Sequence, residues 1–491
     1  MRVTGLPLRG YPGDHRYVRA QHRARLAALR CRSPRARRDR SGRAATRRPD
    51  GDLPTVRPDL ARALAAAFLA GEWTEAGLAA SGAYVLGRRT AWLAPLARQV
   101  VALYPRAPHD RPRELAANLS SRPAAAKARG AAPQVRPVAE TRMVASRWRV
   151  PVLDGLDDVA DFFGVSGSEL DWFSDPRRLA RGTTAVPLQH YRVSHRTAPS
   201  GAIRVLEAPK TRLKVMQRRL LDEVASRIPP HDAARGFRPG GSVRSYARPH
   251  AGRSVVVRLD LEAFFASVTV SRVYGIWRTA GYPEPVAHCL AGLVTCVLPR
   301  SSWRAVPRPA DDELLDAHWR LGRRLAAPHL PQGAPTSPAM ANLAAFRLDV
   351  RLTALAQSWG GRYTRYADDL AFSGEAGWGR GTSRLLDAIE EIVRDEGFRL
   401  NARKTGVMPR AGRQRLGGLV VNEVPRVARH EVDRLRAILH NCHRDGPSTQ
   451  NRDDVPAFED HLRGRIAWVA QHDPTRGARL QAVHDAIDWS R

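Results

Sequence analysis

The stretch RYTRYADDLAFSG, residues 362–374, places two adjacent aspartates, Asp368 and Asp369, between two short runs of alternating strand-forming residues. Alternation of this kind, interrupted at the acidic pair, predicts a β-hairpin with both carboxylates at its turn. An Asp-Asp dipeptide is by itself common in turns. Between apolar strands, however, adjacent carboxylates repel each other and are costly unless cations neutralise them. The stretch therefore indicates a site for metal cations.

A third carboxylate follows a second strand. In SVVVRLDLEAFF, residues 254–265, the run Val255–Leu259 predicts a buried strand that leads directly into Asp260. Phosphoryl transfer to a nucleotide uses two Mg²⁺ ions roughly 3.5–4 Å apart, one at the attacking hydroxyl and one at the leaving pyrophosphate. Mg²⁺ prefers a few carboxylates together with phosphate and water oxygens. Asp260, Asp368 and Asp369 are therefore the predicted catalytic residues and metal ligands.

The net charge indicates a polyanionic partner. The 491 residues include 80 Lys+Arg against 48 Asp+Glu, a formal net charge of +32. The lysines are Lys127, Lys210, Lys214 and Lys404. Because nearly all of the basic residues are arginine, the composition also indicates a GC-rich genome. Such a bias does not require a net positive charge, and nucleic acid is the common partner of chains of this kind.

Cysteine usage and hydropathy exclude several classes. The four cysteines are Cys31, Cys289, Cys296 and Cys442. With no CxxC pair among them, they argue against a zinc ribbon or a disulfide framework and fit a reducing cytoplasm. The N-terminus MRVTGLPLRG lacks the apolar segment of a signal peptide. The longest apolar stretch, around residues 286–298, is too short to cross a bilayer, so we expect a cytoplasmic protein with no membrane partner.

The chain divides into five expected segments. Residues 1–57, rich in Arg and Pro, predict a basic arm without a fold of its own. Residues 58–119 carry apolar residues at helical spacing and predict a small helical domain, followed by a linker at residues 120–149. Residues 150–427 are continuously patterned, and residues 428–491 predict a final helical domain. The helical domain near the N-terminus would extend a nucleic-acid-binding surface, act as a fused effector or docking module, or serve only as a structural appendage.

Two helices of the patterned part are predicted from their periodicity. Residues 335–359, PTSPAMANLAAFRLDVRLTALAQSW, are expected to form one long helix that begins near a proline. Residues 213–228 predict an amphipathic helix. Its apolar face would consist of Leu213, Met216, Leu220, Val224 and Ile228.

The motifs around the aspartates resemble those of a known family. YADD, residues 366–369, is similar to the catalytic box of reverse transcriptases. LPQGAPTSPAMANL, residues 330–343, resembles the QG-to-SP motif of bacterial retron-type enzymes and lacks the extra glycines of group II intron maturases. Four further motifs follow the family's order: APKTRLKVMQ (208–217), HDAARGFRPGGSV (231–243), RLDLEAFFASV (258–268) and GFRLNARKT (397–405).

The resemblance covers residues 150–490 and implies both a fold and an activity. The implied fold is an α+β right-hand polymerase, with fingers and palm at residues 150–427, a helical thumb at residues 428–491 and an N-terminal helical extension. The implied enzyme is an RNA-directed DNA polymerase of retron type, a nucleotidyltransferase that copies a structured non-coding RNA into DNA from dNTPs. Two Mg²⁺ ions, with Mn²⁺ as an alternative, would serve the reaction. Anti-phage defence is the implied setting, which would allow an effector protein as an additional partner.

The resemblance also implies roles by position. The backbone carbonyl of Leu261 would be a further metal ligand. Arg204 would pair with the triphosphate and Lys404 would protonate the pyrophosphate, although both residues fit a solvated surface nearly as well. The remaining substrate-binding residues are Phe265, an aromatic gate against a ribose 2′-OH or else a core aromatic, and Gln332 and Gly333, which would line the pocket of the nascent base pair.

Two positions depart from the retron pattern. The usual Asn-Ala-x-x-His box reads Tyr246-Ala247-Arg248-Pro249-His250, and the usual Val-Thr-Gly reads Leu416-Gly417-Gly418. Tyr246 and His250 are the predicted RNA-recognition residues, and Gly417 and Gly418 form the predicted primer-grip turn. These departures leave open a retron-like enzyme with another RNA or another priming mode. A non-catalytic RNA-binding scaffold and a group II intron maturase are the remaining alternatives.

Overall fold

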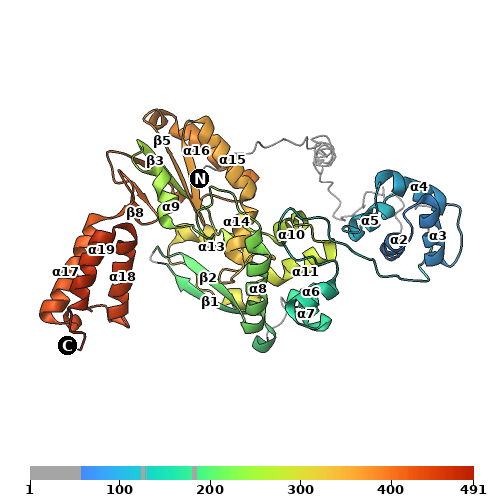
Figure 1. Cartoon of the computed structure of the whole chain (residues 1–491), viewed down its shortest axis with the longest axis horizontal. Helices are drawn as coiled ribbons and strands as arrows, with labels where there is room; N and C mark the ends of the chain where they lie inside the picture. Colours follow the sequence, from blue (N-terminus) through green and yellow to red (C-terminus); the bar gives the residue numbers. More distant parts are fainter. Residues whose placement is uncertain (1–56, 123–127, 129, 180–184, 199, 491) are drawn as a thin grey trace, which may run out of the picture. The chain divides into compact units, whose positions relative to one another are not determined.

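The computed structural model describes residues 57–122, 128, 130–179, 185–198 and 200–490 (Figure 1). The basic arm predicted at residues 1–57 therefore lies, apart from Arg57, outside the described residues. Within the described parts of the chain, no helix is both long and apolar enough to cross a membrane.

A four-stranded antiparallel sheet positions the predicted catalytic residues. Its strand order is β4-β5-β3-β6, with β3 at Val255–Asp260, β4 at Arg362–Tyr366, β5 at Asp369–Gly374 and β6 at Gly406–Pro409. The predicted hairpin is confirmed as β4 and β5. Tyr366 pairs with Asp369, so Ala367 and Asp368 form the turn and Asp369, predicted to lie in it, is instead the first residue of β5. On the other side of β5, Asp260 lies opposite Asp369. The three aspartates thus share one end of the sheet.

The sheet has a hydrophobic core on each face. Side chains alternate along a strand, and in β3 Val255, Val257 and Leu259 belong to the main core. Val256 instead belongs to a second core, which it shares with the C-terminal helices. Burial on both faces explains why β3 is a continuous apolar run rather than an alternating one.

Helices α8, α10, α11, α14, α15 and α16 contribute to the main core. They span Thr211–Glu223, Val270–Thr279, Glu284–Val294, Ser337–Ala344, Phe346–Ser358 and Trp378–Asp395. The apolar face predicted for residues 213–228 is buried as expected, although α8 ends at Glu223 and a short 3₁₀ turn follows. Shorter elements complete this region: α6 at Leu156–Phe163, α7 at Gly167–Ser174, α9 at Val243–Ala247, α12 at Arg300–Arg304 and α13 at Leu315–Leu325.

The prediction of one long helix over residues 335–359 is wrong. The chain forms α14 and α15, separated at Ala345, whose ψ of 2° lies outside the helical range. The two helices have different partners, since α14 packs on α10 whereas α15 packs on β4 and α16. Helical periodicity cannot report such a change of direction, because both pieces keep their apolar faces.

Three further groups of elements complete the fold. A two-stranded hairpin consists of β1 at Tyr191–Thr197 and β2 at Ile203–Pro209. A small sheet of β7 (Arg415–Leu416), β8 (Leu419–Val420) and β9 (Arg426–Val427) precedes α17 at Arg429–Asp445, α18 at Phe458–His472 and α19 at Pro474–Asp485. Helices α2 (Pro58–Ala70), α3 (Glu75–Leu86), α4 (Leu93–Leu103) and α5 (Pro112–Ser120) enclose a separate core.

Candidate active site

The three aspartates approach one another through backbone pairing. Asp260 ends β3 and Asp369 begins β5, opposite it. Asp368 occupies the hairpin turn, where its carbonyl accepts a hydrogen bond of 2.9 Å from the amide of Leu261. Ala367, the other turn residue, has a φ of 57°, a conformation that costs a non-glycine residue energy. The site is thus built on paired strands rather than on a free loop.

The carboxylates differ in their neutralisation. Lys404 Nζ lies 3.0 Å from Asp260 Oδ2, and Arg258 Nη2 lies 2.8 Å from Asp369 Oδ1. Among the described residues, no basic side chain forms an ion pair with Asp368. Burial, and then the charge of Asp260, raise the pKa of Asp368 to about 6. Burial also raises the pKa of Asp260, although its hydrogen bond from Lys404 opposes the change.

This arrangement fits a divalent cation. Asp368 is a mostly buried carboxylate to which the described residues offer no ion-pair partner, and it lies next to Asp260, which is 4% exposed. Such a group is unfavourable unless a cation compensates it. The donors at hand are carboxylate oxygens and, beside Asp260, the backbone of Leu261, and oxygen donors are those that Mg²⁺ and similar hard cations prefer.

A buried ion pair that the sequence did not reveal braces the catalytic hairpin. Arg365 of β4 and Asp349 of α15 are both fully buried, and their atoms meet at 2.6 and 2.8 Å. Arg365 also donates to the Asn342 side chain at 2.9 Å and to the carbonyl of Ala367 at 3.1 Å. The pair therefore holds the backbone of the turn that carries Asp368. The strand pattern contains no sign of it, because an Arg in an alternating strand ordinarily points to solvent.

Two residues beside the aspartates were also missed. Arg258, which pairs with Asp369, lies within the predicted strand motif, and Asn401 lies in the motif that carries Lys404. The backbone N–H of Asn401 donates a hydrogen bond of 2.8 Å to the backbone carbonyl of Asp260. Arg258 could have been found from its position two residues before Asp260, because alternate residues of a strand share one face.

The predicted substrate-binding residues lie on several elements. Arg204 is exposed on β2, directly opposite Arg196 of β1, so the hairpin presents two guanidinium groups on one face. Phe265 is half-buried with its ring 6.2 Å from that of Phe237, whereas its neighbour Phe264 is 4% exposed and belongs to the core.

Gln332 and Gly333 lie against β2. The Gln332 carbonyl accepts a 2.8 Å hydrogen bond from the amide of Glu207. Gly333 has a φ of 130°, and a Cβ there would meet the Glu207 carbonyl at 3.2 Å. Both the backbone conformation and the close approach therefore require glycine at this position.

Tyr246 and His250, the predicted RNA-recognition residues, are enclosed by the protein, so any role in RNA recognition would be indirect. Both side chains are 0% exposed. His250 bonds Ser373 at 2.7 Å and Thr364 at 2.8 Å, and burial lowers its pKa to about 3. A neutral, enclosed imidazole that joins β4 to β5 supports the sheet and cannot reach RNA. Tyr246 packs on the hairpin, with its ring 5.8 Å from that of Tyr366.

Gly417 and Gly418 form the two-residue turn between β7 and β8. Their φ angles of 54° and 86° are those of a hairpin turn with two left-handed residues. A Cβ at Gly417 would lie 2.5 Å from Val243 Cγ1 and 3.6 Å from the Tyr246 ring. The turn thus lies tightly against α9.

Known proteins similar to this chain were found by sequence. The family model described as reverse transcriptase (RNA-dependent DNA polymerase) matches residues 195–422. The retron Mx65 reverse transcriptase of Myxococcus xanthus is 40% identical over 335 residues, which cover 68% of this chain and 72% of that protein. The retron Ec86 reverse transcriptase of Escherichia coli is 27% identical over 334 residues, or 67% of this chain and 88% of that protein.

Solved structures give a weaker similarity. A foamy viral protease-reverse transcriptase in complex with double-stranded DNA is 14% identical, covers 71% of this chain and 51% of its own, and has a TM-score of 0.30. At that TM-score the match has no weight beside the sequence similarities.

Proposed function

This chain belongs to the bacterial retron-type reverse transcriptases, which are RNA-directed DNA polymerases, and on that premise we propose that it copies a structured non-coding RNA into DNA by two-metal nucleotidyl transfer. Members of the family use divalent metal ions and bind nucleic-acid templates and primers. The observation that carries the proposal is the meeting of Asp260, Asp368 and Asp369 at one end of the sheet, where the described residues supply an ion-pair partner to Asp260 and Asp369 but not to Asp368.

The proposed roles at the metal site follow from the donors present. Two Mg²⁺ ions, with Mn²⁺ as an alternative, would stabilise negative charge on the attacking and leaving oxygens when bound. Asp260, Asp368, Asp369 and the Leu261 carbonyl would hold them. The buried pair of Arg365 and Asp349 would keep the turn in place before substrate arrives.

The proposed substrate contacts lie around this site. Arg204 would bind the triphosphate of the incoming dNTP. A planar guanidinium is well suited to this, because it can donate two parallel hydrogen bonds to a phosphate. Phe265, rather than the core residue Phe264, would exclude a ribose 2′-OH. Gln332 and Gly333 would line the nascent base pair, held there by their contacts with β2.

Lys404 is proposed to protonate the leaving pyrophosphate from its place beside Asp260. Lys404→Met removes the ammonium group and should lower kcat for dNTP incorporation by about 10²-fold, the usual effect of losing a general acid, with little change in primer-template affinity. Single-turnover incorporation and filter binding would measure the two quantities.

Two variants separate the roles of Lys404. Lys404→Arg keeps the charge beside Asp260 but is a poor proton donor, so it should be nearly as slow as Lys404→Met. Recovery of activity in the arginine variant would mean that Lys404 acts by charge alone. The matched control is Lys214→Met, which removes an exposed lysine on α8 and should leave incorporation unchanged.

We keep the division into fingers and palm at residues 150–427 and thumb at residues 428–491 as a proposal. The C-terminal helices, which share a core with one face of the sheet, are compatible with a thumb. Gly417 and Gly418 would form the primer grip between palm and thumb. Anti-phage defence, a cytoplasmic location and an effector partner remain proposals drawn from the family.

A second candidate, a retron-like enzyme with another RNA or priming mode, is supported by one observation. The two departures from the retron pattern, at Tyr246 and Gly417, are neighbours in space. A Cβ at Gly417 would be in ordinary contact with the Tyr246 ring at 3.6 Å, and its close neighbour would be Val243 at 2.5 Å. The two changes therefore lie at one place, where retron enzymes carry residues linked to their RNA.

Sequencing the nucleic acid that copurifies with the full chain tests these proposals. We expect a short DNA covalently joined to one discrete RNA. A DNA without attached RNA would favour the second candidate. RNA alone, together with no metal-dependent incorporation on any primed template, would favour the non-catalytic scaffold and contradict the proposed function.

A further inference from the structure

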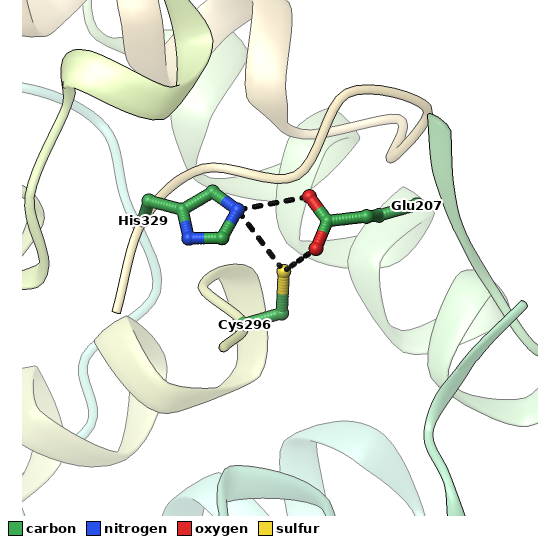
Figure 2. Close-up of side chains that lie close together, drawn as sticks. All are labelled: Glu207, Cys296 and His329. Atoms are coloured by element: carbon green, nitrogen blue, oxygen red, sulfur yellow. Dashed lines mark hydrogen bonds and ion pairs between the residues drawn. The ribbon is translucent and has the colours of Figure 1, made fainter. Parts of the chain in front are cut away.

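A second cluster of metal-binding side chains lies outside the aspartate site. Figure 2 shows Glu207, Cys296 and His329 pointing toward one another. They come from β2, from the segment between α11 and α12, and from the segment between α13 and α14. Among the described residues this is the one group of three such side chains whose ligand atoms all lie within 4.8 Å of one another.

The separations of the ligand atoms fit one tetrahedral ion. His329 Nε2 lies 2.8 Å from Glu207 Oε2 and 3.7 Å from Cys296 Sγ, and Sγ lies 3.3 Å from Glu207 Oε1. Around a tetrahedral Zn²⁺, the usual bond lengths place nitrogen, sulfur and oxygen ligands about 3.4–3.6 Å apart. The two contacts of Glu207 use different carboxylate oxygens, so the side chains would shift to bring one Glu207 oxygen, Nε2 and Sγ around a single ion.

The histidine is oriented as a ligand. His329 Nδ1 lies 2.7 Å from the carbonyl oxygen of Ala327, and because a carbonyl only accepts, Nδ1 carries a hydrogen. Nε2, which lies between Glu207 and Cys296, is then the ring nitrogen that would bind a metal after giving up its own hydrogen. Metal-binding histidines are commonly held in this way, with the second ring nitrogen donating to a backbone carbonyl.

Burial and donor type select the ion. Glu207 is 2% exposed and His329 is 1% exposed. A carboxylate and a thiolate together bring two negative charges, which a divalent cation would balance in this enclosed place. A set of one sulfur, one nitrogen and one oxygen suits Zn²⁺ and is unsuited to Mg²⁺. Glu207 and Cys296 also line a cavity of about 480 Å³, which leaves room for a water molecule.

We propose that Glu207, Cys296 and His329 bind one Zn²⁺ ion, with water as the fourth ligand. The ion joins β2 to the segment that carries Gln332. Backbone hydrogen bonds already follow this route, from Cys296 to His329 at 3.0 Å and from Glu207 to Gln332 at 2.8 Å. Zinc would therefore stiffen one wall of the proposed dNTP pocket, although its binding does not depend on that role.

Metal content tests the proposal directly. The full chain, loaded with zinc sulfate and dialysed against zinc-free buffer containing Mg²⁺, should retain about one zinc per chain by mass spectrometry. Cys296→Ser should lower that content at least about tenfold. Serine keeps a hydroxyl that can donate to Glu207, so a cluster held only by hydrogen bonds would tolerate the change. Cys289→Ser, at a buried cysteine outside the cluster, is the matched control and should retain its zinc.

Two further measurements guard against misfolding and adventitious zinc. Replacement of zinc by Co²⁺ in the unmodified chain should produce a thiolate-to-cobalt charge-transfer band, which requires direct sulfur ligation. A zinc-selective chelator should lower the Tm of the unmodified chain by several degrees and leave Cys296→Ser unaffected. The proposal is overturned if the loaded chain retains less than about a tenth of an equivalent of zinc, or if Cys296→Ser retains as much as the unmodified chain.

Discussion

Asp368→Asn should reduce dNTP incorporation on a primed RNA template by at least about 10³-fold, since loss of a metal ligand removes several kcal/mol of transition-state stabilisation. Asp368 is the carboxylate that no basic side chain among the described residues neutralises, so the proposed ions are its natural partners. Asparagine keeps the size of the side chain and removes the charge that binds a cation. Single-turnover incorporation at saturating Mg²⁺ measures the loss.

The same variant should keep its fold and its RNA. An ionised carboxylate in this buried place beside Asp260 disfavours the folded state when no cation is bound, as the raised pKa of Asp368 indicates. The Tm of Asp368→Asn in metal-free buffer should therefore equal or exceed that of the unmodified chain. RNA that copurifies with the variant should remain, and the DNA joined to it should be absent.

The matched control is Asp387→Asn, which changes an exposed aspartate on α16 and should leave incorporation intact. Normal incorporation by Asp368→Asn would remove Asp368 from the metal site. A large fall in RNA affinity would instead show that the substitution disturbs the nucleic-acid surface.

Asp349→Ala should destabilise the fold by about 3–5 kcal/mol, the usual cost of leaving a buried charge without its partner. Arg365 would remain fully buried and keep its hydrogen bonds to the Asn342 side chain and the Ala367 carbonyl, while the Tyr363 hydroxyl would lose its acceptor on Asp349. The Tm in thermal unfolding should fall by roughly 10 °C, and incorporation at lower temperature should fall as well, because the turn that holds Asp368 loses its brace.

Two controls separate the charge from the position of this pair. Asp395→Ala breaks an exposed ion pair with Arg351 and should cost less than about 1 kcal/mol. The double change Asp349→Leu with Arg365→Met replaces the pair by apolar side chains and should recover much of the stability, as such replacements often do. Incorporation should stay low in the double variant, because nothing then holds the Ala367 carbonyl.

A Tm for Asp349→Ala within about 2 °C of the unmodified chain would show that Arg365 finds other partners or reaches water. Recovery of both stability and incorporation in the double variant would show that the pair supports the core and has no role in positioning the turn.

The β4–β5 hairpin was predictable from local pattern, because alternation along two strands and an acidic pair between them are properties of consecutive residues. The same holds for the apolar run before Asp260 and for the amphipathic face from Leu213 to Ile228. The break at Ala345 was not predictable in this way. Both flanking segments have helical periodicity, and only their separate packing partners distinguish two helices from one.

Roles that depend on exposure required the packed structure. Tyr246 and His250 belong to one motif of predicted RNA-recognition residues, yet both are enclosed, and His250 satisfies both ring nitrogens between β4 and β5. Whether a polar side chain faces solvent or a neighbouring strand depends on what covers it. The sequence of one motif does not show which other segments of the chain pack over its side chains.

The sequence by itself determined the family, the three aspartates and the hairpin that holds two of them, since strand alternation and turn position follow from the order of residues along the backbone. Only the tertiary structure decided which of the three carboxylates has no ion-pair partner among the described residues, that Arg365 is buried and that Cys296 meets His329. Lys404 reaches Asp260 across 144 positions of the chain, and Cys296 lies 89 positions from Glu207 and 33 from His329. These contacts form when segments far apart in the sequence pack into one core. They depend on the free energy of packing the whole fold, which a local sequence pattern does not report.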